Sequence, residues 1–379
     1  MQKQAGELFT NRIEHGEDGL PIYSVTMDDG MVKRSSLDRK FDDIAESGGN
    51  KKVHKNDIAY NMMRMWQGAF GVAVEDCMVS PAYVVLAPQE GVSSDFFGRL
   101  MKTPCLLRSL TSQSHGLTKD RLRLYYKDFA QIALPLPSPA EQQKIAECLS
   151  SVDELMAGQA RKVDAIKTHK KGLMQQLFPR EGETQPRLRF PEFQNAGEWV
   201  EVALGDIAEI KLGKMLDKQK HTTGRLLPYL NNISVRWNEV NTSNLPQMYF
   251  NDNELDRFGL RAGDVVVCEG GEPGRAAVWD GRLPVLKFQK AIHRVRFNVP
   301  FQPRLLVLHL ENLAGRTQFE MLFTGGGIRH LTRETFALLK IPLTSPAEQQ
   351  RIADCLTSLD DLIAAETQKL DALKTTRKG

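Results

Sequence analysis

Loops in both halves of the chain combine basic, aromatic, amide and glycine residues. In the N-terminal half the candidate residues are Arg64, Trp66, Gln67, Gln113 and His115. In the C-terminal half they are Arg236, Trp237, Arg275, Lys287, Gln289, Lys290, Arg329 and His330. Arginine, lysine and glutamine side chains can contact phosphates or base edges, and neighbouring glycines let a backbone approach a duplex closely. A single tryptophan is more often part of a core and a single glycine run more often a turn. The prediction of a DNA-binding surface therefore depends on the sum of these loops.

Patterns that would indicate catalysis or metal binding are weak or missing. The five cysteines stand singly, without a C-x-x-C pair, which predicts reduced thiols and no zinc site. The segment from Gly271 to Arg275 lacks the spacing and the lysine of a phosphate-binding loop. Glu269 and Glu272 are two carboxylates in a glycine loop, which alone is weak evidence for acid–base chemistry. We therefore expect a non-catalytic protein that binds no metal.

The overall composition restricts the class of protein less than the motifs do. No apolar run approaches the ~18 residues of a membrane span, and the N-terminus lacks a signal-peptide pattern, so we expect a cytoplasmic protein. The formal net charge of +3 is compatible with a nucleic-acid binder and equally with an ordinary enzyme.

The chain contains an internal repeat. Residues 138–172 return as residues 345–379, an offset of 345 − 138 = 207, and 21 of the 35 aligned positions are identical. The same offset relates Leu20-Pro21 to Leu227-Pro228 and Asp57-Ile58 to Asp264-Val265, whereas the sequence between these anchors diverges. We therefore predict two copies of one unit, each a variable globular module followed by a similar helix.

Both ends of the chain look shortened against this repeat. Only 20 residues precede Pro21, whereas the stretch WVEVALGD at 199–206 lies about two dozen residues before Pro228. The first helix also continues into LMQQLFP after Gly172, and the second copy stops at Gly379. We expect the first module to lack its start and the second helix to be short.

Each repeated segment begins like a helix. Ser138-Pro139-Ala140-Glu141 and Ser345-Pro346-Ala347-Glu348 are capping boxes with proline at the first helical position. Apolar residues then alternate at spacings of four and three: Ile145, Leu149, Val152, Met156, Val163, Ile166 and Leu173 in the first copy, and Ile352, Leu356, Leu359, Ile363, Leu370 and Leu373 in the second. Polar residues interrupt this register at Gln159, Lys170, Glu366 and Arg377.

A stripe of two apolar positions in seven is typical of a coiled-coil seam, and its polar interruptions suit the selection of register. We predict that the two helices pack against each other, antiparallel, about a pseudo-two-fold axis. The alternative is that each helix packs only onto its own module. The first helix would be roughly 60 Å long at ~1.5 Å per residue, so it could act as a spacer between modules.

The globular modules predict an α+β fold with a strongly bent β core. Short β-like runs lie at 21–25, 57–60 and 82–86 in the first module and at 264–268 and 292–297 in the second, with helical stretches near 95–102 and 304–313. The predicted organisation is a first module at 1–136, a first helix at 137–180, a linker at 181–198, a second module at 199–343 and a second helix at 344–379.

With these elements in place, the chain resembles the specificity subunit of type I restriction-modification systems. The motifs that carry the resemblance are IALPLPSPAEQQKIA from Ile132, IPLTSPAEQQRIA from Ile341, GLMQQLFP from Gly172, PRLRFPEF from Pro186, WVEVALGD from Trp199 and DIAYNMMRMWQGAFGV from Asp57. They cover both halves of the chain.

The resemblance implies two target recognition domains, each reading one half of a bipartite, asymmetric site on double-stranded DNA. It implies two methyltransferase subunits docked on the helices, and motor-nuclease subunits that join for restriction. S-adenosylmethionine, ATP and Mg²⁺ would belong to those partners, with no cofactor in this chain. Two alternatives remain: a stand-alone coiled-coil DNA-binding scaffold or regulator without methyltransferase partners, and an enzyme with an unrecognised site.

Overall fold

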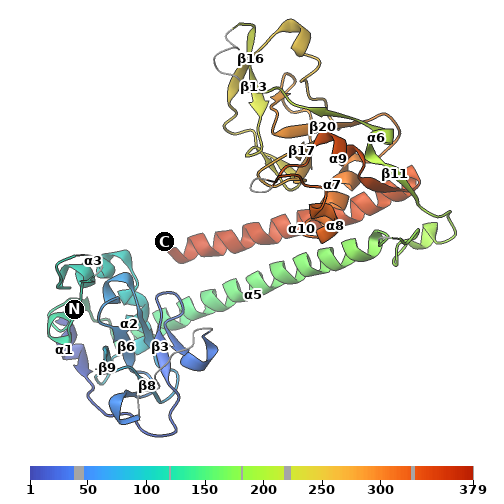
Figure 1. The fold of residues 1–379 in the computed structure, drawn as a ribbon. Coiled ribbons are helices and arrows are strands. Elements are labelled where there is room, and N and C mark those ends of the chain that lie inside the picture. Colours follow the sequence, from blue (N-terminus) through green and yellow to red (C-terminus); the bar gives the residue numbers. More distant parts are fainter. Residues whose placement is uncertain (38–46, 119–120, 181, 217–222, 326–328, 379) are drawn as a thin grey trace. The chain divides into compact units, whose positions relative to one another are not determined.

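The computed structural model describes residues 1–37, 47–118, 121–180, 182–216, 223–325 and 329–378 (Figure 1). The chain divides into two compact units, residues 1–157 with 376–379 and residues 158–375. This division falls within the first long helix, so it does not test the predicted module boundaries. Each unit is described by itself below.

The first module is built on a four-stranded antiparallel sheet. Its strands lie in the order β2 (Phe9–Asn11), β9 (Tyr83–Pro88), β6 (Ile58–Asn61) and β7 (Phe70–Val72). Strand pairs surround it: β1 (Gln2–Gln4) with β10 (Ala133–Pro135), β3 (Tyr23–Val25) with β4 (Met31–Lys33), and β5 (Lys51–Val53) with β8 (Cys77–Val79). The helices are α1 (Ala5–Leu8), α2 (Ser94–Met101), α3 (Pro104–Ser112) and α4 (Tyr126–Phe129), with 3₁₀ turns η1 (Arg34–Ser36), η2 (Ser47–Gly49) and η3 (Met65–Gln67).

The second module has a four-stranded antiparallel sheet with the same strand order. Its strands are β12 (Ala208–Leu212), β20 (Ile292–Phe297), β17 (Val265–Cys268) and β18 (Ala276–Val278). It also has a three-stranded sheet, β16 (Gln247–Phe250), β13 (Arg225–Leu230) and β19 (Lys287–Phe288), and the pairs β11 (Val200–Ala203) with β21 (Lys340–Leu343) and β14 (Val235–Arg236) with β15 (Glu239–Val240). The helices are α6 (Leu204–Ile207), α7 (Pro303–Leu313), α8 (Thr317–Glu320) and α9 (Arg333–Ala337), with 3₁₀ turns η5 (Pro191–Phe193) and η6 (Asp252–Glu254).

Both modules are therefore mixed α and β, as predicted. The predicted strands at 57–60, 82–86, 264–268 and 292–297 correspond to β6, β9, β17 and β20, and the predicted helices correspond to α2 and α7. These stretches were predictable because alternating or continuous β-branched residues favour strands, and because their side chains are buried in the sheet cores.

We expected the counterpart of residues 199–206 to be missing from the first module, but a strand equivalent to β11 is present there. Strand β1 pairs with β10 so that Gln2 faces Pro135, and β11 pairs with β21 so that Glu201 faces Pro342. The offset between these N-terminal strands is 201 − 2 = 199, whereas Pro135 and Pro342 differ by 207. Counting backward from Pro21 missed the equivalent strand because the second module has 207 − 199 = 8 more residues between this strand and the first anchor.

The two long helices are α5 (Pro139–Leu177) and α10 (Pro346–Lys378). The first capping box forms in both directions: the Glu141 amide donates to Ser138 Oγ at 3.3 Å, and the Ser138 amide donates to Glu141 Oε2 at 2.8 Å. The Glu348 amide likewise donates to Ser345 Oγ at 3.3 Å. The Glu348 carboxylate, however, accepts hydrogen bonds from the linker.

Each helix starts on its own module through a fully buried glutamine. Gln142 Oε1 accepts from the Ser93 amide at 2.8 Å, and Gln349 Oε1 accepts from the Gln302 amide at 2.9 Å. Ala146 belongs to the core of the first module, whereas Ile145 is 42% exposed. The prediction that Ile145 belongs to a helix–helix seam is therefore wrong, because the first turns of α5 face the module.

Within the second unit, α5 and α10 run antiparallel (Figure 1). Gln159 contacts Glu366, and further along α5 Lys170 contacts Asp360, which lies earlier in α10. The seam residues Val163, Ile352 and Leu356 are buried, and the remaining predicted seam residues other than Ile145 are half-buried. The end of α5, the start of α10 and α7 share one apolar cluster, so the helices pack both on each other and on the second module.

The linker between α5 and the second module is held by a buried ion pair. Arg189 donates to both carboxylate oxygens of Glu348, with Nε–Oε1 at 2.7 Å and Nη2–Oε2 at 2.8 Å. Arg189 also donates to the carbonyls of Ala196 and Gly197, and the Thr344 hydroxyl donates to the same carboxylate. Because both charged side chains are almost fully buried, the linker has one defined path across the start of α10.

Candidate nucleic-acid interface

In the first module, the structure brings the two predicted basic segments together. The Leu124 amide donates to the Met62 carbonyl at 2.9 Å, which places the segment after α3 beside the segment that leads into η3. Arg64, Gln67, Gln113 and His115 are exposed. Trp66 is half-buried, and its indole NH donates to the Met63 carbonyl at 3.1 Å. The indole NH therefore has a structural partner within the module.

Three further arginines beside these segments were missed in the sequence. Arg108 on α3, and Arg121 and Arg123 in the loop that follows, are exposed. Within the part of the chain that the structure describes, none of them forms an ion pair with a carboxylate, which leaves three guanidinium groups accessible to phosphates. The run KDRLR at 119–123 is a charge signal that could have identified two of them.

In the second module, a network around Glu272 joins two predicted segments. Trp237 lies in the turn between β14 and β15, and its indole NH donates to Glu272 Oε1 at 3.0 Å. Arg275 donates to Glu272 Oε2 at 2.7 Å and to the Asn232 carbonyl at 2.7 Å. Arg275 is thus engaged on the protein, and it positions the loop around Asn232. Arg236 is exposed beside this network.

The loop around Asn232 presents an apolar side chain to solvent. The Asn231 side chain accepts from the Ile233 amide at 3.0 Å and from the Ser234 amide at 3.1 Å, which fixes the turn. Ile233 is nevertheless 78% exposed. In the first module Leu117 is 96% exposed, in the same loop as Arg121 and Arg123. Each predicted surface therefore combines cations with one exposed aliphatic side chain, which is suited to contact a thymine methyl group.

The glycines of the second module have a role in packing within the module. A Cβ at Gly270 would lie 3.0 Å from His330 Nδ1, at Gly271 2.7 Å from Asn232 Nδ2, and at Gly274 2.6 Å from the Phe319 ring. Gly271 and Gly274 also have positive φ angles of 81° and 88°. Close packing within the module therefore requires these glycines, whatever approaches from outside.

The remaining predicted residues of the second module are scattered. Lys290 is exposed and Gln289 is half-buried. Arg329 is exposed and pairs with Glu320 at 3.0 Å, and half-buried His330 bridges to the backbone of Gly270 and Thr324. In the predicted glycine run at 325–330, residues 326–328 lie outside the described residues.

The prediction of DNA contact for Lys287 is contradicted by its burial. Its side chain is 6% exposed, and Nζ donates to the Leu255 carbonyl at 2.8 Å. Burial lowers the pKa of its ammonium group. A lysine in a short strand between apolar neighbours looked like a surface cation in the sequence, but its long side chain turns inward to satisfy a backbone carbonyl.

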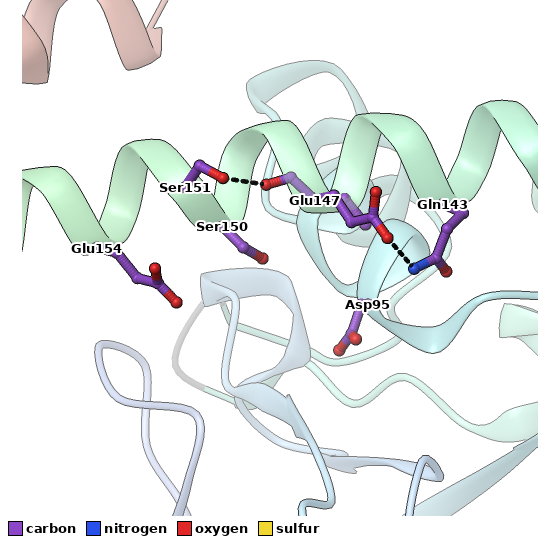
Figure 2. A pocket seen from close by; sticks show the side chains of 7 residues that line it. Asp95, Gln143, Glu147, Ser150, Ser151 and Glu154 are labelled. Carbon is purple, nitrogen blue, oxygen red and sulfur yellow. Dashed lines mark hydrogen bonds between the residues drawn. The ribbon is translucent and has the colours of Figure 1, made fainter.

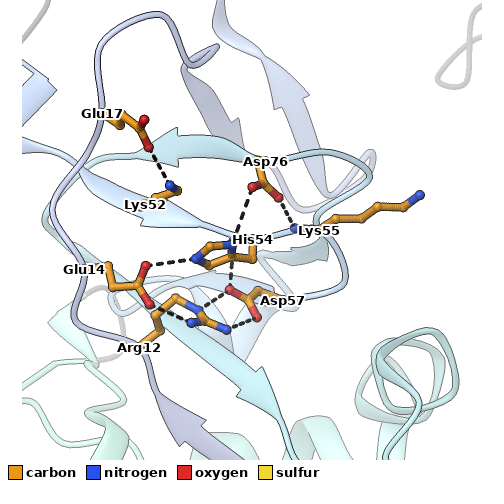
Figure 3. A network of polar contacts seen from close by, with 8 residues as sticks. All are labelled: Arg12, Glu14, Glu17, Lys52, His54, Lys55, Asp57 and Asp76. Atoms are coloured by element: carbon orange, nitrogen blue, oxygen red, sulfur yellow. Dashed lines mark hydrogen bonds and ion pairs between the residues drawn. The ribbon is translucent and has the colours of Figure 1, made fainter.

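The sheets that carry these loops are anchored by equivalent buried aspartates. Asp57 precedes β6 and accepts two hydrogen bonds from the Arg12 guanidinium, at 2.7 and 3.2 Å (Figure 3). Asp264 precedes β17 and accepts two from Arg296, both at 2.7 Å. The hydrogen-bonded carboxylates raise the pKa of Arg12 and Arg296. These bidentate pairs hold the central sheet of each module in place, so the loops of the two modules can differ in sequence.

A pocket of about 420 Å³ on the first unit does not suit DNA. It lies between α5 and the start of α2, and the side chains that line it are Asp95, Gln143, Ala146, Glu147, Ser150, Ser151 and Glu154 (Figure 2). Its three carboxylates would repel phosphates. Among the described residues, no group of three or more His, Cys, Asp or Glu side chains is arranged to hold a metal ion. No helix in the described ranges has the length and apolar character needed to cross a membrane.

Comparison with known proteins gives a consistent result. The family described as "Type I restriction modification DNA specificity domain" matches residues 17–168 and 196–375. A curated relative, the type I restriction enzyme MjaVIII specificity subunit of Methanocaldococcus jannaschii, is 24% identical over 341 residues, covering 86% of this chain and 77% of the relative.

Two solved structures share the fold. A chain from a study of complex assembly and conformational transition of the type I R-M system aligns with a TM-score of 0.61 at 15% identity, covering 100% of this chain and 95% of that one. The type I restriction-modification S subunit from M. genitalium aligns with a TM-score of 0.56 at 15% identity, covering 100% and 93%.

Proposed function

The chain belongs to the family of type I restriction-modification DNA specificity domains. On that basis we propose separate functions for its modules and its helices. Each module reads one half of a bipartite, asymmetric DNA site. The repeated helices dock two methyltransferase subunits, and motor-nuclease subunits complete the complex that restricts foreign DNA. We propose that the chain acts on its DNA in the cytoplasm.

The observation that supports this proposal is that the two modules share their sheets and helix starts but differ in their accessible loops. The four-stranded sheets share one strand order, and the helices begin on the modules through equivalent buried glutamines. The accessible loops have no such equivalence. In the first module Leu117 shares a loop with Arg121 and Arg123, whereas in the second Ile233 follows Asn232, whose carbonyl accepts from Arg275 of the Glu272 network. A repeated frame can bind two identical partners, while two different loop sets read two different sequences.

We further propose that the chain itself performs no catalysis and binds no cofactor. S-adenosylmethionine would be bound by the methyltransferase subunits, and ATP and Mg²⁺ by the motor subunits. The supporting observation is the character of the accessible clusters. Glu272 is held by Trp237 and Arg275, and the carboxylates of the pocket on α5 have no histidine or cysteine beside them among the side chains that line it, so its serines have no histidine to activate them.

A module exchange with methylation mapping tests the proposal. Residues 199–343 would be replaced by the second module of a related subunit, the chain would be co-expressed with methyltransferase subunits, and modified bases would be sequenced across the genome. We expect one half of the modified bipartite motif to change and the other to stay. A change in both halves, or no modified motif with the unaltered chain, would refute the proposal. Methylation by the purified chain alone would refute the assignment of catalysis to its partners.

A further inference from the structure

At one point in the helix pair, a residue meets its own repeat equivalent. Gln159 and Glu366 differ by 366 − 159 = 207, the offset of the repeat. Gln159 Nε2 donates to Glu366 Oε2 at 2.6 Å and to the Glu366 carbonyl at 2.8 Å. The Glu366 side chain is 3% exposed. The contact therefore lies at the centre of symmetry of the pairing, where both helices contribute the same register position.

The contacts on either side of this centre repeat each other. Lys170 pairs with Asp360 at 2.7 Å, and Arg377 pairs with Asp153 at 2.7 Å. Adding 207 to Lys170 and subtracting 207 from Asp360 gives Arg377 and Asp153. Each ion pair is therefore the repeat equivalent of the other.

The cations next to the centre obey the same relation. Lys162 and Lys369 differ by 369 − 162 = 207, and both pair with Glu366 Oε1, at 3.1 and 2.9 Å. Because each helix supplies one lysine, a carboxylate at either central position would have both lysines within reach.

These equivalences mean that the two flanking helix–helix ion pairs do not distinguish α5 from α10. If α5 paired antiparallel with α5 of a second copy, Asp153 would face Lys170. If α10 paired with α10, Asp360 would face Arg377. Both arrangements retain an ion pair. Among these helix–helix contacts, only the central one changes in character, because like pairing would put glutamine against glutamine or carboxylate against carboxylate.

We propose that the Gln159–Glu366 pair makes α5 select α10 over the like helix of a second copy of this chain. Two glutamates at the centre would place two carboxylates at hydrogen-bonding distance, where they repel. Two glutamines would leave Lys162 and Lys369 without an anionic partner at the interface. The unlike pair alone combines a charge-assisted hydrogen bond with neutralised lysines. A polar residue in an apolar seam is a known means of setting partner choice at some cost in stability.

The like pairings can be reproduced within the full-length chain. Gln159→Glu creates the carboxylate pair, Glu366→Gln creates the amide pair, and the double variant Q159E/E366Q restores an unlike pair in the opposite orientation. The readout is amide hydrogen exchange in α5 and α10 at about pH 8. An exposed glutamine on the same helix provides the matched control, Gln175→Glu.

We expect each single variant to exchange about tenfold faster in these helices, the effect of losing one charge-assisted hydrogen bond. The double variant should lie within about twofold of the unaltered chain, and Gln175→Glu should change nothing. Near pH 4, the Gln159→Glu defect should shrink, because a shared proton lets the two carboxyls bond in the presence of Lys162 and Lys369.

Single variants that exchange like the unaltered chain would overturn the proposal, because the pair would then discriminate nothing. A double variant as defective as the single variants would also overturn it, because the two positions would not be equivalent. If Gln159→Glu fails to fold, Glu366→Gln and the double variant still decide between these outcomes.

Discussion

The two modules solve the same structural problem with different residues. Each holds its central sheet with a buried aspartate before the equivalent strand, but Asp57 recruits Arg12 from the end of β2, whereas Asp264 recruits Arg296 from β20. The position of the carboxylate is retained and the donor moves to another strand. The two copies therefore share the sheet and a buried aspartate with an arginine partner. They differ in which strand supplies that arginine.

The helix starts show the same contrast in a sharper form. Glu141 and Glu348 are repeat equivalents, since 348 − 141 = 207. Glu141 is exposed and only completes its capping box, whereas Glu348 is 1% exposed and binds Arg189. Glu348 therefore both caps its helix and binds Arg189, because in the second copy the linker passes over the start of the helix.

The largest loss of stability should come from breaking the Arg189–Glu348 ion pair. Glu348→Ala removes one partner of a buried bidentate pair and leaves Arg189 buried without its counter-ion, which should lower the free energy of unfolding by about 3 kcal/mol. Urea unfolding of the full-length chain, followed by exchange protection in the second unit, measures it. Glu141→Ala, the matched control in the first unit, should have a much smaller effect. Equal effects of the two variants would show that Glu348 acts only as a cap.

The part of the fold that sequence could predict is the part governed by local physics. Capping boxes and apolar spacing predicted α5 and α10, and the polar interruptions Gln159 and Lys170 find partners across the helix pair. The side-chain direction of Ile145 was not predictable, because the choice between module and partner helix is made by tertiary contacts such as those of Gln142.

The candidate interface was less predictable than the fold. Composition identified exposed Arg64 and Arg236, but it also selected Lys287, whose burial depends on a carbonyl supplied by Leu255 from a distant loop. It missed Ile233, because the exposure of an aliphatic residue follows from a turn that only the folded chain shows. DNA contact by the exposed residues stays a prediction.

Acid should destabilise the second unit before the first. Burial of His309 on α7, against the Phe178 ring, lowers its pKa to about 4. The unfolded chain, with an ordinary histidine pKa of about 6.5, binds this proton first, so stability falls as pH drops from about 6.5 to about 4. The expected loss is about 2–3 kcal/mol. None of the histidines described in the first unit is buried.

Urea unfolding at about pH 7 and about pH 5, followed separately in each unit by hydrogen exchange, measures this difference. His309→Gln removes this titrating group, so the second unit of that variant should lose part of its extra acid sensitivity even if it is less stable throughout. Buried His293, whose pKa is also lowered by burial, retains the rest. A variant with undiminished acid sensitivity would exclude His309 as the cause.

The two buried glutamines should differ by one hydrogen bond. The Gln142 amide donates to the carbonyls of Gly91 and Pro137 as well as accepting from Ser93, whereas Gln349 donates only to Thr344 among the described residues. Gln142→Ala should therefore cost about 2 kcal/mol and Gln349→Ala somewhat less, since each leaves buried backbone groups without partners. Thermal unfolding of the two variants checks the order, and the reverse order would show that cavity formation outweighs hydrogen bonding.

The smallest predicted effect concerns recognition and leaves stability unchanged. Ile233 is held by a fixed turn and is largely exposed, so Ile233→Ala should not shift thermal unfolding. If its side chain contacts a thymine methyl group, the variant in its methyltransferase complex should bind its site about fivefold more weakly, a cost of about 1 kcal/mol.

Replacing single thymines of the site by deoxyuridine removes that methyl group. The unaltered chain should lose affinity at one position of one half-site, and Ile233→Ala should lose nothing further there. Leu338→Ala, which truncates a 69% exposed leucine at the end of α9, is the matched control and should bind normally. If deoxyuridine weakened both chains equally at every position, Ile233 would make no such contact, and the difference between the modules would then lie in their polar loops alone.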